Sequence, residues 1–137
     1  MTSNEQKALD AAERLIATCD HLAEIVGLGR DSYASEIRTQ WAIEMGLIRL
    51  GEEVSRIPEE IRARFPGQPW RIIIDMRNMA AHQYDALTSQ RVWRTLTEDI
   101  PKLRDYVAAE MVPALRADCA VDADGTASGS GGPITLG

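Results

Sequence analysis

The fold is decided by residues 70–82, which read WRIIIDMRNMAAH. The β-branched run Ile72-Ile73-Ile74 would by itself suit a strand. The apolar positions continue beyond it at spacings of three and four residues, which a helix produces and a strand does not, at Met76, Met79 and Ala80. Pro69 precedes the stretch, in a place where its missing N–H costs nothing in a helix. We therefore expect a helix over the whole stretch.

Two amphipathic helices are expected before residues 70–82. Apolar residues recur at helical spacing from Ala8 to Val26, and Gly27 and Gly29 then end the first helix. The second helix should cover about residues 35–56, with Asp31 and Ser32 available as caps. The residues expected to face inward from it are Trp41, Met45, Leu47, Ile48, Leu50 and Val54.

A short helix or turn over residues 58–65 and a loop over residues 66–69 lead to the third helix. A fourth long helix is expected from a cap at Thr88 or Ser89 to residues 111–113. Pro101 lies inside this pattern and predicts a kink or break near Asp99. The residues of this fourth helix that are expected to face inward are Val92, Trp93, Leu96, Ile100, Leu103 and Val107.

The chain shows no strand pattern and no internal repeat. Four helices joined by short connections predict an all-α, antiparallel up-and-down four-helix bundle with a short extra helix. With 137 residues, one domain is expected, and we place it at residues 1–116. Residues 117–137 are rich in Gly, Ser, Ala and Asp without periodicity, which predicts a flexible, disordered tail.

The composition is that of a globular protein, with 45% hydrophobic and 26% charged residues. No apolar run approaches the roughly 18 residues of a membrane span, and residues 1–7 contain no hydrophobic signal core. We expect a cytoplasmic protein with no membrane partner. Cys19 and Cys119 are far apart and show no Cys/His ligand spacing, so neither a disulfide framework, a metal site nor a cofactor is indicated.

The charge is unevenly distributed along the chain. The net charge of -6 argues against nucleic acid, since phosphate is bound largely by Lys and Arg. Residues 62–104, however, hold eight basic against four acidic residues, a local balance of +4. This basic second half is compatible with an anionic ligand, and equally with chance.

Arg77, Asn78, His82 and Tyr84 lie together at the end of the third predicted helix. Attack of a ribose 2′-hydroxyl on the adjacent phosphate needs a proton acceptor, a proton donor and positive charge, but no metal. Histidine, with an ordinary pKa of about 6.5, serves as acid or base, and arginine is a permanently charged fork that matches phosphate. Asn78 can orient the histidine or donate to a phosphoryl oxygen, and Tyr84 adds a hydroxyl or a stacking surface.

Helix geometry divides these residues between two faces. Arg77 and Tyr84 share one face, and Asn78 and His82 share another. Arg77 and His82 are about 140° apart around the axis, so one straight helix does not aim both at the same atom. This spacing favours a homodimer in which a second copy supplies the missing half of the site.

The same window also has a purely structural interpretation, and spacing alone favours it. His82 can stabilise the C-terminal end of its helix by about 0.3–1 kcal/mol, and Arg77 can pair with Asp75 or Glu44. We assign no function to His21. We expect Trp41, Trp70 and Trp93 to be core or boundary anchors rather than base-stacking platforms.

Three segments together resemble the HepT-like branch of the HEPN superfamily. Residues 68–84 are similar to its signature, with the spacing Arg-x4-His-x-Tyr, and Gly51-Glu52-Glu53 is similar to its Gly-Glu element. Val92-Trp93 and residues 98–103 resemble its last helix. The resemblance covers about residues 5–112.

The resemblance implies a dimeric HEPN bundle that acts as a metal-independent endoribonuclease toxin of a toxin–antitoxin pair. It implies that Arg77 and His82 are catalytic and that Asn78 assists them. It also implies a nucleotidyltransferase antitoxin of the MntA type, which transfers AMP to Tyr84 and so opposes RNA by charge and bulk. The alternative is a non-catalytic HEPN subunit that presents substrate to a partner nucleotidyltransferase.

Overall fold

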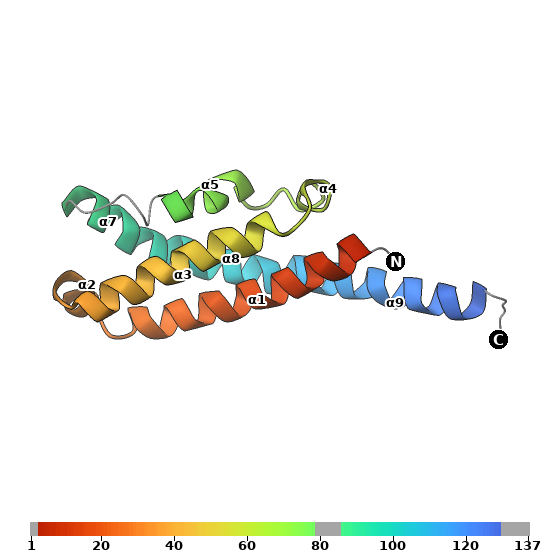
Figure 1. Cartoon of the computed structure of the whole chain (residues 1–137), viewed down its shortest axis with the longest axis horizontal. Coiled ribbons are helices and arrows are strands. Elements are labelled where there is room, and N and C mark those ends of the chain that lie inside the picture. The colour runs from red at the N-terminus through yellow and green to blue at the C-terminus, as the bar shows by residue number, and fades with distance from the viewer. Residues whose placement is uncertain (1–2, 79–85, 130–137) are drawn as a thin grey trace.

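The computed structural model describes residues 3–78 and 86–129, and every regular element among them is helical (Figure 1). Within residues 3–78, the elements are α1 (Ser3–Val26), α2 (Arg30–Ser35), α3 (Ile37–Ser55), α4 (Glu59–Arg62) and α5 (Trp70–Ile74). Residues 86–129 form one continuous helical rod. It consists of α7 (Ala86–Arg94), a π-helical turn η1 (Thr95–Asp99), α8 (Ile100–Tyr106), a second π-helical turn η2 (Val107–Met111) and α9 (Val112–Gly129). The predicted all-α class is confirmed.

Figure 1 shows α1 and α3 side by side and antiparallel, with the rod of α7, α8 and α9 behind them and α5 along α3. α1 packs against α3, α8 and α9, so it joins the front of the bundle to the rod. The predicted helical bundle is confirmed.

The core is formed by one face of each long helix. Leu15 of α1, Leu47 and Leu50 of α3, and Val107 and Leu115 of the rod are each exposed by 1% or less. The expected inward residues of the last helix are buried, except Trp93, which is partly buried and packs against the core.

The prediction is wrong for Trp41 and Met45, which are 64% and 51% exposed. Met45 is about 160° around the α3 axis from the buried Leu47, which places it on the opposite face. The apolar residues of α3 therefore extend over more of the helix than its own bundle covers.

Two predicted caps are also wrong. Asp31 and Ser32 lie inside α2, an element that the pattern did not predict, and the hydroxyls of Ser32 and Thr39 are 2.7 Å apart and buried. Here a tertiary partner satisfies the hydroxyl, so it does not need to mark a helix end. Thr88 and Ser89 lie inside α7, because the strong helix formers that precede them already belong to the helix.

The third helix is interrupted. α5 ends at Ile74, Asp75 forms a turn, and residues 76–78 are helical again, so the prediction of one uninterrupted helix is wrong at Asp75. Residues 79–82 lie outside the described part. The three isoleucines are helical, as the spacing predicted.

The rod continues through two prolines. Pro101 and Pro113 each stand two residues after a π-helical turn. A proline ring clashes with the carbonyl four residues earlier, and in both cases that carbonyl belongs to the wider π turn, which relieves the clash. The predicted helix end at residues 111–113 is therefore wrong, since α9 reaches Gly129. The domain boundary at residue 116 and the flexible tail remain predictions, and residues 130–137 lie outside the described part.

Candidate active site around Arg77

A carboxylate of α3 holds Arg77 at the surface. The guanidinium Nη1 of Arg77 donates to Oε1 of Glu52 at 2.5 Å, and the two side chains are 43% and 42% exposed. Asp75 and Glu44, the partners considered from the sequence, do not pair with it in the described structure. Such an exposed pair adds little stability, so its main effect is to fix the direction of the guanidinium.

Gly51 allows the segment that carries Arg77 to lie directly on α3. A Cβ at this position would be 2.9 Å from the carbonyl oxygen of Ile74 and 3.3 Å from that of Ile73. Both are backbone atoms, which cannot rotate aside as a side chain does. Gly51 thus provides the close approach and Glu52 beside it provides the anchor, which is a physical reason for the Gly-Glu pair.

Glu53 belongs to the interior rather than to the site. It is 7% exposed, and its carboxylate accepts hydrogen bonds from Arg14 Nε at 3.0 Å and Arg56 Nη1 at 3.1 Å. These bonds join α1 to the same turn of α3 that carries Gly51 and Glu52. The turn is therefore fixed from both sides.

Because of the turn at Asp75, consecutive residues face different surroundings. The N–H of Asn78 donates to the carbonyl oxygen of Asp75 at 2.9 Å and closes the turn. Met76 is buried, whereas Arg77 and Asn78 are exposed. The turn therefore presents two polar side chains of the predicted site to the outside.

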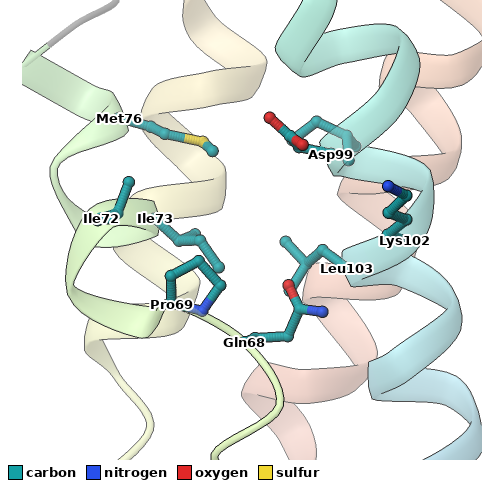
Figure 2. Close-up of a pocket in the computed structure, with 9 residues that line it drawn as sticks. Gln68, Pro69, Ile72, Ile73, Met76, Asp99, Lys102 and Leu103 are labelled. Carbon is teal, nitrogen blue, oxygen red and sulfur yellow. The ribbon is translucent and has the colours of Figure 1, made fainter.

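Met76 also lines a groove of about 260 Å³ between α5 and the rod. Figure 2 shows Ile72, Ile73 and Met76 on one wall and Leu103 on the other. The remaining lining residues are Gln68, Pro69, Asp99, Ile100 and Lys102. Residues 76–78 thus contribute Met76 to a mainly apolar groove and the exposed guanidinium of Arg77 to the outside.

The structure brings together only part of the predicted site. Arg77 and Asn78 are adjacent and exposed, while His82 and Tyr84 lie outside the described residues. The predicted roles of His82 and Tyr84, and the helix faces they are expected to share with Asn78 and Arg77, therefore remain predictions. Glu52, as the anchor of Arg77, was missed by sequence reasoning because a contact across 25 residues leaves no local signal.

In the part of the chain that the structure describes, the remaining reactive side chains do not form a second site. Burial raises the pKa of the Cys19 thiol to about 12, so this thiol stays protonated at neutral pH. His21 is exposed, with Nδ1 3.7 Å from Oε1 of Glu24. Among the described residues, no three His, Cys, Asp or Glu side chains are grouped to hold a metal ion. Within the same residues, no helix has the length and apolar character needed to cross a membrane.

Comparison with known proteins gives consistent matches. Residues 15–110, which include Glu52 and Arg77, match the family model described as Ribonuclease HepT-like. "Putative RNase TTE0752" of Caldanaerobacter subterraneus subsp. tengcongensis is 28% identical over 96 residues, which is 69% of this chain and 86% of the relative. "Probable ribonuclease HepT" of Thermococcus cleftensis is 31% identical over 74 residues, 54% of this chain and 67% of the relative. No solved structure matches the chain.

Proposed function

Since the chain belongs to the ribonuclease HepT-like family of the HEPN superfamily and is an endoribonuclease, we propose that it is the toxin of a toxin–antitoxin pair. It acts in the cytoplasm as a homodimer, and it cleaves RNA without a metal ion. The observation that supports this most directly is the exposed Arg77, fixed by Glu52 at the end of a tightly docked segment. The guanidinium of Arg77 pairs with Glu52 and its side chain is still 43% exposed, so it remains accessible to a phosphate.

In the proposed reaction, the 2′-hydroxyl oxygen of a ribose attacks the neighbouring phosphorus and the P–O5′ bond breaks. The products are a 2′,3′-cyclic phosphate and a 5′-hydroxyl. One proton leaves the 2′-hydroxyl oxygen and another is added to the leaving 5′-oxygen; His82 carries out one of these transfers and solvent the other. The guanidinium of Arg77 donates to the phosphoryl oxygens, whose negative charge grows in the transition state, and Asn78 donates beside it.

The proposed partner is an MntA-type nucleotidyltransferase antitoxin that modifies Tyr84. The phenol oxygen of Tyr84 attacks the α-phosphorus of ATP, a phosphodiester forms and pyrophosphate leaves. The added negative charge lies seven residues from Arg77 along the chain and opposes the binding of RNA phosphate. Co-expression with the antitoxin should add about 329 Da per AMP to the intact mass, and Tyr84→Phe should abolish that increase.

The ribonuclease is tested by incubating the purified protein with tRNA and mRNA in EDTA. Arg77→Ala and His82→Ala should each lower the cleavage rate by about 100-fold or more. Arg71→Ala is the matched control, since Arg71 is also exposed but lies on α5, before the turn. Absence of cleavage by the wild type, or full activity in both site variants, would refute the proposal.

The same variants address the non-catalytic alternative. A subunit that only presents substrate to a nucleotidyltransferase should keep any toxicity in Arg77→Ala and His82→Ala. If the variants lose toxicity but still bind the nucleotidyltransferase, the non-catalytic alternative is excluded.

A further inference from the structure

Three polar side chains line the mainly apolar groove between α5 and the rod. Gln68 lies in the loop before α5, while Asp99 and Lys102 lie on the rod, three residues apart. Among the described residues, none of these three side chains makes a hydrogen bond or an ion pair. An apolar cavity with a few convergent polar groups is the usual form of a ligand site.

The polar groups lie at the two ends of the groove. Figure 2 shows Asp99 and Lys102 on the rod side, with the Asp99 carboxylate pointing towards the wall that carries Met76. Gln68 lies at the opposite end, and the apolar side chains of Ile73 and Leu103 lie between the two ends. This arrangement suits a flat ring with polar edges.

Hydrogen bonds hold the Gln68 end of the groove in place. The N–H of Gly67 donates to Oη of Tyr106 on the rod at 3.1 Å. The N–H of Trp70 donates to the carbonyl oxygen of Gln68 at 3.0 Å, and its indole Nε1 donates to the carbonyl oxygen of Phe65 at 2.7 Å. Because these bonds fix the backbone on both sides of Gln68, the groove is formed before a ligand arrives.

We propose that the groove binds a guanine base of the RNA beside the cleavage point, which makes Asp99 and Lys102 specificity-determining residues; this rests on the proposed ribonuclease. The Asp99 carboxylate accepts hydrogen bonds from N1–H and N2–H of guanine, and the Lys102 ammonium donates to O6. Gln68, which can both donate and accept, faces another edge of the ring. The aliphatic side chains cover the two faces of the base.

The choice of guanine follows from the pairing of a carboxylate with an ammonium group. A carboxylate offers two acceptor oxygens, and an ammonium group offers only donors. The Watson–Crick edge of guanine presents the acceptor O6 followed by two neighbouring N–H donors. Adenine, cytosine and uracil each have a single donor group on this edge. Guanine therefore matches both side chains, whereas each of the other bases leaves a carboxylate oxygen without a donor.

The polar side chains also argue against an apolar side chain of a partner protein as the occupant. Such a side chain would cover the carboxylate, the ammonium group and the amide without replacing their hydrogen bonds to water, which is unfavourable. The groove of about 260 Å³ is also smaller than the roughly 300–1,000 Å³ of sites for drug-sized ligands. It therefore suits a single base better than a helix or a peptide.

Consecutive residues join the groove to the proposed phosphate site. Met76 is buried and lines the groove, and the guanidinium of the next residue, Arg77, is held at the surface by Glu52. The Cα atoms of Met76 and Arg77 are about 3.8 Å apart. An RNA strand with a phosphate at Arg77 therefore has a neighbouring base within reach of the groove. Asp99 accepts from that base rather than facing a phosphate, and Lys102 beside it balances its charge.

Base preference is measured with short RNAs that differ at one position beside the cleaved bond. The wild type should cleave the RNA with guanine about tenfold faster than the same RNA with adenine, because a bidentate contact is lost. Inosine lacks the 2-amino group and should also be cleaved more slowly than guanine. 7-Deazaguanine keeps the whole Watson–Crick edge and should be cleaved like guanine.

Variants assign the preference to the groove. Asp99→Asn and Lys102→Met should each remove most of the preference for guanine, and both side chains are exposed, so the urea midpoint should not change. Glu98→Gln is the matched control, since Glu98 is exposed beside Asp99 but does not line the groove. Arg77→Ala should slow the cleavage of all the RNAs alike.

Methyl NMR of the methionines measures binding without cleavage. Guanosine monophosphate should shift the methyl resonance of Met76, which Met76→Leu identifies, and adenosine monophosphate at the same concentration should not. Met111 is fully buried in η2 and does not line the groove, so its resonance should stay in place with both nucleotides.

Three results would overturn the inference: equal cleavage of the guanine and adenine RNAs, an Asp99→Asn variant that keeps the preference, or a Met76 resonance that responds to both nucleotides alike or to neither. If Arg77→Ala still abolishes cleavage in these cases, the proposed ribonuclease stands. A Met76 shift specific for guanosine monophosphate, in a protein that cleaves no RNA, would instead support the guanine site and refute the ribonuclease.

Discussion

The two faces of α3 contain similar apolar residues but have different neighbours. Leu47 and Leu50 on the inner face are exposed by 1% or less, whereas Trp41 and Met45 on the outer face are about half exposed or more. The regular spacing of apolar residues along a helix indicates which faces are hydrophobic, but not which part of the chain or which other molecule covers each face. The difference separates the face that folds the chain from the face that remains available for association.

The largest expected effect is on the inner face. Leu50→Ala should lower the free energy of unfolding by about 2–5 kcal/mol, because it leaves a cavity at a fully buried position. Met45→Ala, on the outer face, should cost about 0.5 kcal/mol or less under conditions where the protein is monomeric. Urea unfolding of both variants measures the contrast, and equal losses would contradict the division into two faces.

Gly51→Ala should have the next largest effect. The added Cβ would be 2.9 Å from the carbonyl oxygen of Ile74, so α5 must move away from α3. Overpacking of this kind costs about 1–3 kcal/mol, and the better helix propensity of alanine returns up to about 1 kcal/mol. We expect a net loss in urea unfolding together with reduced RNA cleavage, since Arg77 moves with the segment. A stabilised variant with full activity would show that the close contact at Gly51 does not position Arg77.

The sequence predicted those parts of the fold that depend on local pattern. Helical spacing was enough to assign the three isoleucines at residues 72–74 to a helix, and it located most of the buried residues of the rod. It could not predict the turn at Asp75 or the anchor at Glu52, because both depend on how closely α5 approaches α3. It also placed Trp41 inside, because burial depends on the neighbours that the tertiary structure supplies.

Two neighbouring acids extend the comparison to charged residues. Glu53→Gln should lower stability by about 1 kcal/mol, because a buried carboxylate that accepts from Arg14 and Arg56 becomes neutral. Glu52→Gln should change the free energy of unfolding little, since its pair is exposed, and should lower RNA cleavage several-fold because Arg77 is held less firmly. If Glu53→Gln lowered RNA cleavage without lowering stability, and Glu52→Gln lowered stability without lowering cleavage, the roles assigned to the two acids would be reversed.

The smallest effect on the folded monomer is expected from Trp41→Ala. At low protein concentration, where the monomer dominates, the variant should unfold within about 0.5 kcal/mol of the wild type, because a largely exposed side chain contributes few internal contacts. At higher concentration the two should diverge. Association stabilises the folded wild type by mass action, so its melting temperature rises with concentration, whereas that of Trp41→Ala stays nearly constant. Thermal melts over a hundredfold concentration range, with Leu28→Ala as the control, measure the difference. A concentration-independent wild type would mean that the outer face of α3 is not covered by a second copy, because exposure alone does not couple stability to concentration.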